Sequence, residues 1–259
     1  MTCACHAPRA PRAPHAHALS RRAVLTGAVA APVLLAGCDR LPLLVSEAEA
    51  AAMGERAWAD IKRQTPVSGD PADRALVGRI ATRLLTAAGR DPRGWELAVF
   101  RGDAVNAFAL PGNKIGVYEG MIRLAGSEGE LAAVIGHEIG HIDADHSRER
   151  MSASKAGNGA MRLIRWLLDL GDVEYAEAVI GALGVGVEFG ILRPYGRGQE
   201  EEADLMGVRH MAAAGYDPRD SIALWTRMDA LESRGPEFLS THPAPRSRIE
   251  ALETAIAAV

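Results

Sequence analysis

One short motif constrains this chain more than any other feature. Residues 137–141 read His-Glu-Ile-Gly-His inside the apolar run 131–142. Two histidines four residues apart lie on one face of a helix, so both imidazoles can reach a single metal ion. Glu138 lies beside them, where a carboxylate can take a proton from water. The alternative is a buried helix with two incidental histidines, and the later segments argue against it.

The sequence also predicts where this helix starts. Ser127 and Glu130 stand three residues apart just before the apolar run, which is the spacing of a capping box. We therefore expect a helix that begins near residue 127 and carries the motif.

A zinc ion bound by two histidines needs a third protein ligand from another segment. Glu200 and Asp204 are four residues apart, so they share one helical face. Glu200 is therefore the candidate third ligand, with Asp204 accepting a hydrogen bond from the outer ring nitrogen of a histidine, preferably His137. Taken alone, three consecutive glutamates are more simply a solvated helix start, and it is the upstream motif that favours the ligand.

Two other histidines have simpler interpretations. His146 is nine residues after His137, about half a turn round a continuous helix, so we expect it to face away from the metal in a structural or helix-terminal role. His210 lies on a polar helical stretch, and we expect it at the surface.

The first 37 residues have the composition of a secretory signal peptide. They hold four arginines and no acidic residue, and their apolar run 23–36 is too short to span a membrane. The run ends in Leu-Ala-Gly-Cys38, which resembles a bacterial lipobox, in which the cysteine is lipidated and begins the mature chain. Residues 20–25 resemble a twin-arginine export motif with two departures, and a plain Sec signal is the alternative. Asp39 resembles an inner-membrane retention signal.

Net charge and cysteine content limit which partners the chain can have. The whole chain has a formal net charge of −4, and residues 1–37 contribute four arginines, so the rest carries −8. Such a surface is a poor match for nucleic acid, and it argues against a polybasic membrane patch. We therefore expect membrane attachment through the lipid on Cys38. The other cysteines, Cys3 and Cys5, would leave with the leader, so we expect no disulfide.

The periodicity of the chain predicts an α+β fold that is mostly helical, with a small mixed β-sheet beside the helix that carries the motif. After a linker at 38–45, we expect one domain over 46–259. Its expected strands are 95–101, 105–110 and 114–118. Its expected helices are 46–64, 71–88, the motif helix from about 127 through the apolar run 131–142 with its end within 143–155, 161–170 after the glycines at 157 and 159, 199–214, 218–232 and 244–257. The glycine-rich segment 173–192 could be helix or loop.

Four motifs in this order resemble the gluzincin metallopeptidases of the HtpX, BepA and LoiP type, relatives of mitochondrial Oma and of CAAX prenyl proteases. They are N-A-F-A-L-P-G at 106–112, H-E-x-x-H at 137–141, E-x-x-A-D at 200–204 and T-H-P at 241–243 followed by Arg248-Ile249. The resemblance covers nearly all of the chain after the leader and implies a zincin-like metalloprotease domain with one zinc ion. A lipoprotein with a catalytic domain alone, the LoiP-like layout, fits best.

The resemblance also implies a role for each site residue. His137, His141 and Glu200 bind zinc, and Glu138 is the general base and later the proton donor. Asp204 is an outer hydrogen-bond partner of the ligands.

For other residues the resemblance implies less direct roles. Asn106 and Ala107 would lie on the edge strand that pairs with the substrate backbone. His242 resembles a histidine that stabilises the tetrahedral intermediate or holds the enzyme latent. Arg197 fits the arginine of the family's S-R-x-x-E motif as a second outer partner, although Gly196 replaces the serine.

The sequence thus predicts a zinc-dependent endopeptidase anchored to the bacterial envelope and facing the periplasm, acting on misfolded or unassembled envelope polypeptides. The alternative from another class is a non-proteolytic or latent chaperone-like lipoprotein with a regulatory zinc site. A third option is another zinc hydrolase, such as a small-peptide peptidase or an amidase. Asn106 and Ala107 argue against it, because an edge strand suits extended polypeptide.

Overall fold

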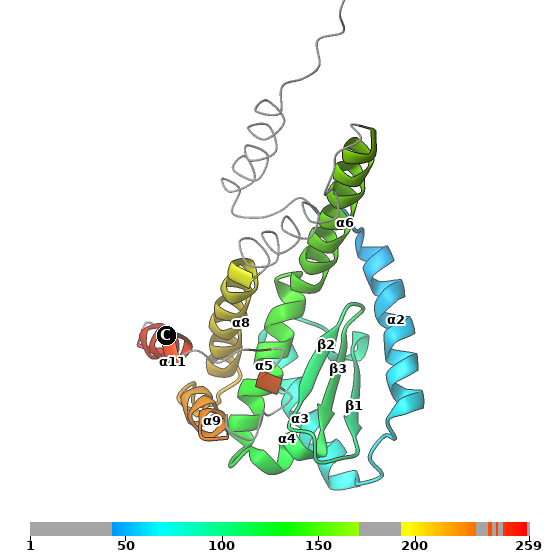
Figure 1. Cartoon of the computed structure of the whole chain (residues 1–259). Helices are drawn as coiled ribbons and strands as arrows, with labels where there is room; N and C mark the ends of the chain where they lie inside the picture. The colour runs from blue at the N-terminus through cyan, green and yellow to red at the C-terminus, as the bar shows by residue number, and fades with distance from the viewer. Residues whose placement is uncertain (1–42, 171–192, 232–237, 240–241, 243–245, 258–259) are drawn as a thin grey trace, which may run out of the picture. The chain divides into compact units, whose positions relative to one another are not determined.

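The computed structural model describes residues 43–170, 193–231, 238–239, 242 and 246–257 (Figure 1). For residues 160–170, 193–195 and 246–247 it describes the backbone alone. The predicted leader with Cys38 and Asp39, and the glycine-rich segment 173–192, lie outside these residues. No helix within the described ranges combines the length and the apolar character that crossing a membrane requires.

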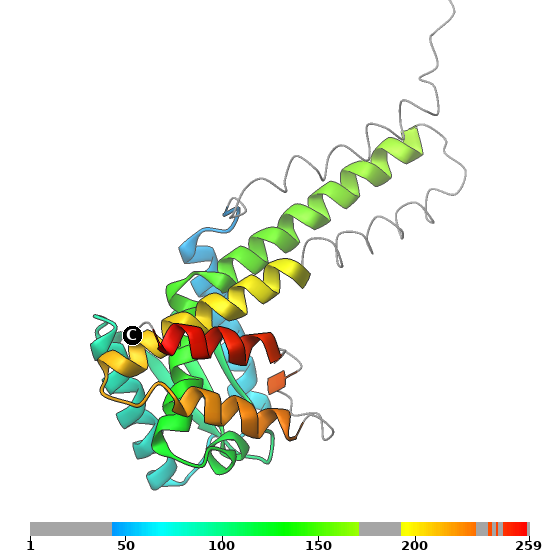
Figure 2. The same ribbon diagram turned by 90° about the vertical axis from the view of Figure 1, so that its left-hand side faces the viewer.

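The described chain is mostly helical with one three-stranded sheet, as the sequence predicts. The strands are β1 (Glu96–Phe100), β2 (Ala107–Leu110) and β3 (Lys114–Tyr118). Ahead of them come α2 (Glu47–Gln64), α3 (Pro71–Ala87) and the short 3-10 helix η1 (Pro92–Gly94). After them come α4 (Glu119–Leu124), α5 (Glu128–Asp143), α6 (His146–Leu170), α8 (Arg193–Ala213), α9 (Asp220–Asp229) and α11 (Arg246–Ile256) (Figures 1 and 2).

The sheet is mixed, and β2 is one of its edge strands. β3 lies in the middle, parallel to β1 and antiparallel to β2. The N–H of Tyr118 donates to the carbonyl oxygen of Asn106 at 3.0 Å, and Ala107 is opposite Val117. Alternate residues of a strand hydrogen-bond in opposite directions. The backbone groups of Ala107 and Ala109 therefore point away from β3, toward the free edge.

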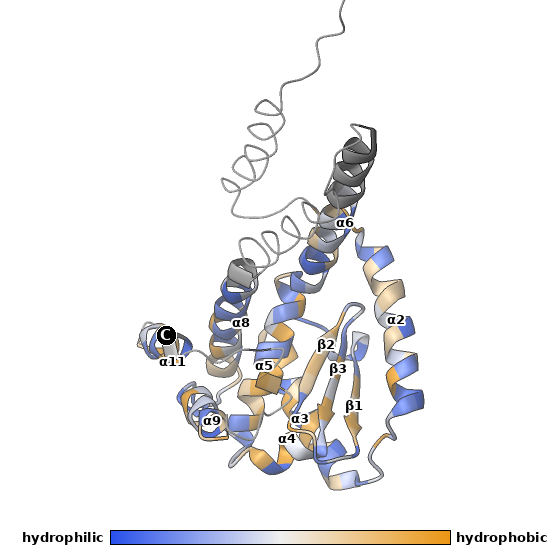
Figure 3. Ribbon diagram, in the orientation of Figure 1, coloured by the Kyte–Doolittle hydropathy of each residue, from blue (hydrophilic) through white to orange (hydrophobic). Residues whose placement is uncertain are grey.

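Each face of the sheet packs on different helices. Ile115 and Val117 join the main core with residues of α3 and α5. On the other face, Phe100 and Phe108 pack around Trp58 of α2, with ring centroids 5.6 and 6.1 Å from the Trp58 ring. Apolar residues colour both the strands and α5 in Figure 3. This packing fixes β2 against α5, the helix that carries the motif.

The N-terminus of α5 forms as the sequence predicts. Ser127 is the N-cap, and its Oγ accepts a hydrogen bond from the N–H of Glu130 at 3.0 Å. The carboxylate of Glu130 reaches back one residue further than in the usual capping box, to the N–H of Gly126 at 2.9 Å.

The seam between α5 and α8 is lined by small residues. A Cβ atom on Gly140 would lie 2.8 Å from the carbonyl oxygen of Ala203, and one on Gly207 would lie 3.0 Å from the backbone nitrogen of His137. The two backbones are therefore closer than ordinary side chains permit. This close approach brings the motif of α5 next to the acidic segment of α8.

Four helices show the clearest differences from the sequence-based expectation. α4 was not expected, since its six residues are too few to show helical periodicity. α6 continues through Gly157 and Gly159, which a helix interior tolerates at about 1 kcal/mol each. α8 begins at Arg193 rather than 199. α9 begins at Asp220, because residues 217–219 form a turn in which the side chain of Asp217 accepts from the N–H of Arg219.

Candidate metal centre

Four side chains converge on one point of the described structure. His137, His141, Glu200 and His242 each offer a ligand atom, and these four atoms lie within 4.8 Å of one another. The two Nε2 atoms of α5 are 3.0 Å apart, and Glu200 of α8 places its carboxylate oxygens 3.3 Å from His137 Nε2 and 3.5 Å from His141 Nε2. The helical spacing predicted from the sequence is therefore the arrangement found.

The donor set suits a divalent metal ion. Glu138 Oε1 is buried and has no hydrogen-bond partner among the described residues, while Glu200 Oε2 has His137 Nε2 at 3.3 Å and Arg248 Nη1 at 3.4 Å. Burying an unpaired carboxylate oxygen is costly, and a bound cation removes that cost. Two imidazoles and a carboxylate are ligands that zinc commonly takes in catalytic sites. The residues present thus fit a metal of this class.

The electrostatics of the ligands are set by burial and by their neighbours. Burial alone would lower the pKa of His137, but hydrogen bonds to the carboxylates of Asp204 and Glu200 raise this pKa to about 9. Burial lowers the pKa of His141 to about 3. Burial would raise the pKa of Glu200, but hydrogen bonds from His137 and His141 hold it far below its usual range. Glu200 is therefore an anion, as a metal ligand must be.

Glu138 lies beside the ligand candidates and has a raised pKa. Burial raises the pKa of its carboxyl group to about 7, partly offset by the charge of His137. The carboxylate accepts a backbone hydrogen bond from Ala109, whose N–H points to the free edge of β2. Its Oε1 lies 3.6 Å from His242 Nε2. A base whose pKa lies near neutral suits proton transfer at neutral pH.

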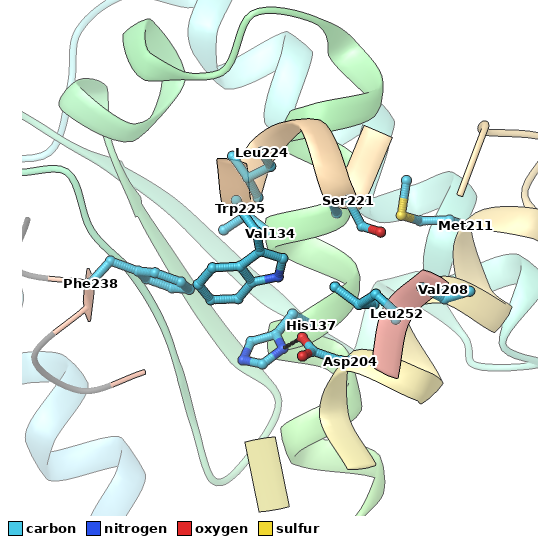
Figure 4. A pocket seen from close by; sticks show the side chains of 12 residues that line it. Val134, His137, Asp204, Val208, Met211, Ser221, Leu224, Trp225, Phe238 and Leu252 are labelled. Carbon is cyan, nitrogen blue, oxygen red and sulfur yellow. Dashed lines mark hydrogen bonds and ion pairs between the residues drawn. The ribbon is translucent and has the colours of Figure 1, made fainter. Parts of the chain in front are cut away.

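His137 is held from behind by a charged network, of which Figure 4 shows the contact between His137 and Asp204. Its Nδ1 lies 2.9 Å from Oδ1 of Asp204, and Arg248 of α11 donates to both oxygens of that carboxylate at 2.7 Å. The Arg248 guanidinium lies 4.0 Å from the centroid of the Trp225 ring. Behind His137, Phe238 and Trp225 help to line a small apolar cavity of about 10 Å³, room for about one water molecule.

The arginine at Glu200 is not the one expected. Arg197 is exposed on α8, whereas Arg150 of α6 donates from Nη2 to Glu200 Oε1 at 2.8 Å and from Nε to Gln199 at 2.6 Å. Arg248 Nη1 also lies 3.4 Å from Glu200 Oε2. Nothing in the local sequence around Arg150 marks it as a partner, because the contact joins two separate helices.

Two histidines lie in surroundings that differ from those expected. α5 ends at Asp143 and α6 begins at His146, so the ring of His146 turns toward His141, with the two Nδ1 atoms 2.8 Å apart. A continuous helix would have kept the two rings apart. His210 was expected at the surface, but its side chain is only 14% exposed, and its Nε2 lies 3.2 Å from Asp143 Oδ2.

Asn106 directly precedes β2, and backbone hydrogen bonds connect His242 to the same end of this strand through Phe238. The side-chain oxygen of Asn106 is buried with no hydrogen-bond partner among the described residues. The N–H of Phe238 donates to Val105 at 3.0 Å, just before β2, and the N–H of His242 donates to Phe238 at 2.8 Å. The Phe238 and His242 rings stack 4.4 Å apart, and burial with the charge of His137 keeps the pKa of His242 well below its usual value.

Comparison with known proteins agrees with this site. The model of peptidase family M48 matches residues 71–256, which include all four ligand candidates and Glu138. The mitochondrial metalloendopeptidase OMA1 of Schizosaccharomyces pombe is 36% identical over 181 residues, which cover 68% of this chain and 51% of that protein. The β-barrel assembly-enhancing protease of Escherichia coli K12 is 26% identical over 245 residues, 88% of this chain and 49% of that protein.

The chain spans about half the length of these relatives. The match nevertheless includes the helices that carry the ligand candidates and confirms the resemblance to zinc metallopeptidases seen in the motifs. The chain therefore belongs to peptidase family M48.

Proposed function

We propose that the chain is a zinc-dependent endopeptidase that hydrolyses peptide bonds in extended polypeptides. The observation that carries this proposal is the position of Glu138, which is buried beside four converging ligand atoms and has a pKa of about 7. A buried carboxyl group near neutral pKa next to a metal site is the arrangement that peptide hydrolysis needs.

His137, His141 and Glu200 would hold the ion. Bound there, zinc supplies a Lewis acid that polarises the scissile carbonyl and lowers the pKa of water toward about 7. Glu138 takes the proton of the attacking water and later delivers it to the leaving amine. Asp204 keeps the proton of His137 on Nδ1, so that Nε2 is free to bind the metal.

The free edge of β2 supports an extended substrate. Ala107 and Ala109 turn their backbone groups away from β3, as an added strand requires. The N–H of Ala109 is directed at Glu138, so this edge runs past the base. The unpaired oxygen of Asn106 is a further acceptor for substrate N–H groups. A strand paired with this edge would have its scissile bond beside Glu138.

We further propose that the chain is a lipoprotein of the bacterial envelope, anchored through Cys38 and facing the periplasm, where it acts on misfolded or unassembled proteins. Support comes from the lipobox-like sequence and from similarity to a protease named for β-barrel assembly. Some relatives are named as mitochondrial proteins, so the compartment needs a direct test. The test is incorporation of a radiolabelled lipid into the chain, which Cys38→Ala should abolish.

The alternative of a latent or non-proteolytic binding protein has one observation in its favour. His242 offers a fourth protein ligand, and zinc with four protein ligands is typical of structural sites, whereas catalytic sites keep one position open.

The test is cleavage of casein by the purified chain, with zinc content measured on the same sample. Glu138→Gln should retain zinc and lose cleavage, whereas Glu201→Gln, the same change at an exposed residue of α8, should retain both. Cleavage by a zinc-loaded Glu138→Gln variant would refute the mechanism. Zinc binding without cleavage in the unmutated chain would favour the latent or binding protein.

A further inference from the structure

His146 owes its position to a break in the helix. The residue before it, Asp145, has a φ of 60°, in the left-handed region that residues other than glycine rarely adopt. Aspartate is among the few side chains that tolerate this conformation. The left-handed residue interrupts the helix, so that α5 ends at Asp143 and α6 begins at His146. As a result, His146 lies against His141 rather than on the far side of a continuous helix.

The contact between the two rings requires one specific distribution of protons. The Nδ1 atoms of His141 and His146 are 2.8 Å apart, so one of them must carry the hydrogen. His141 directs its Nε2 to the ligand cluster and needs a lone pair there to bind a metal. A neutral imidazole carries its hydrogen on the other nitrogen. His141 therefore donates from Nδ1, and His146 accepts.

The outer nitrogen of His146 has a matching partner. With Nδ1 accepting, a neutral His146 carries its hydrogen on Nε2, and this atom lies 3.3 Å from Oε2 of Glu202. The His146 side chain is only 1% exposed, whereas that of Glu202 is 42% exposed. Both ring nitrogens of His146 thus make hydrogen bonds, and these bonds form a series that runs from His141 to Glu202 at the surface.

The acidic segment of α8 consequently serves both histidines. Glu200 faces the ligand cluster, and Asp204 accepts from His137. Glu202, between them in sequence, reaches His141 through His146. Nδ1 of His137 contacts the carboxylate of Asp204, which is paired with Arg248, whereas Nδ1 of His141 contacts the neutral ring of His146. The two candidate ligands therefore differ in the charge of their outer partner.

We propose that His146 is a positioning residue for His141, which fixes the tautomer and the orientation of that ring for metal binding, with Glu202 in turn orienting His146. The inference rests on the proposed function, in which His141 is a metal ligand. Outer partners of this kind typically account for 10- to 100-fold in metal affinity, so we expect about that range here.

The test is the zinc affinity of the purified chain, measured by competition with a chromophoric chelator, together with the thermal midpoint of the chelator-treated protein. His146→Leu removes the acceptor and should weaken zinc binding about 10- to 100-fold. His146→Asn offers an amide oxygen to the same N–H and should recover most of that loss. Glu202→Ala should weaken binding by a smaller factor, and Glu201→Ala, a neighbouring exposed acid, should leave it unchanged.

Three results would overturn the inference. They are zinc affinity in folded His146→Leu within about threefold of the unmutated chain, affinity in His146→Asn no better than in His146→Leu, and equal affinity in Glu202→Ala and Glu201→Ala. The last comparison holds even if His146→Leu fails to fold, because neither glutamate is buried. An unmutated chain that binds no zinc would instead overturn the proposed function.

Discussion

Arg248 holds Asp204 with two parallel hydrogen bonds, from Nε to Oδ2 and from Nη2 to Oδ1, each 2.7 Å long. Both side chains are buried, and Asp204 in turn lies against Nδ1 of His137. The C-terminal helix α11 is therefore connected to the ligand cluster through a bidentate pair. Such a fork is specific to arginine, since a lysine ammonium cannot reproduce its planar geometry.

Arg248→Ala should destabilise the fold by about 3–5 kcal/mol, because it leaves the carboxylate of Asp204 buried without its cation. Chemical denaturation measures this loss. Arg248→Lys should recover part of the stability but not the zinc affinity, since His137 would lose its fixed orientation. Arg209→Ala, at an exposed arginine of α8, is the control and should change neither quantity. Full zinc affinity in Arg248→Lys would show that the fork does not orient the ligand.

Gly140→Ala should destabilise the protein although alanine favours helices. The added Cβ would lie 2.8 Å from the carbonyl oxygen of Ala203, so α8 must shift, at a cost of about 1–3 kcal/mol. Gly157→Ala is the matched control, because no described residue outside its own helix backbone lies within 4 Å of its added atom, and it should stabilise α6 by up to about 1 kcal/mol. Denaturation midpoints compare the two. Equal effects would mean that the seam between α5 and α8 adapts freely.

Glu130 should contribute stability that depends on pH. Burial would raise its pKa, but hydrogen bonds from Arg227 and from the N–H of Gly126 lower it below the usual value. A lowered pKa means that the carboxylate stabilises the fold above its unfolded pKa, near pH 4.5, and that this contribution is lost as the pH falls through the folded pKa.

Glu130→Gln should therefore lower the free energy of unfolding by about 1–3 kcal/mol at neutral pH, and the difference from the unmutated chain should shrink below about pH 4. Urea denaturation at several pH values measures it. Glu253→Gln, at an exposed glutamate of α11, should show little difference at any pH. A difference that grows toward acid would contradict the assignment.

His242→Ala should increase casein cleavage if His242 occupies the fourth ligand position and must leave it before substrate binds. Its ligand atom lies within 4.8 Å of those of the other three residues, so it competes for the coordination position that catalysis needs. The rate should rise at least severalfold, with zinc content unchanged. A fall of 100-fold or more would instead assign His242 to transition-state stabilisation, at about 2.7–4 kcal/mol.

The sequence was most informative where the physics is local. The i, i+4 spacing of His137 and His141, and of Glu200 and Asp204, correctly placed each pair on one face of a helix. Strand alternation likewise located β1, β2 and β3 to within two residues.

Contacts between separate elements could not be predicted from residue spacing or strand alternation. Arg150 meets Glu200 only because α6 and α8 lie side by side, and His146 meets His141 only because Asp145 adopts a left-handed conformation. Neither event has a periodic signal, and aspartate is compatible with both a helix end and a turn. The assumption that residues 137–146 form one continuous helix was enough to hide a neighbour of a predicted ligand.

The division of the ligands between α5 and α8 has a consequence for the life of the protein. His141 and Glu200 come together only in the folded chain, so an ion bound by both helices would stabilise the folded state and leave the unfolded chain unaffected. Its contribution grows with the logarithm of free metal concentration above the dissociation constant. Metal supply would then determine how long each molecule survives as well as how fast it works, so starved cells would lose the protein itself.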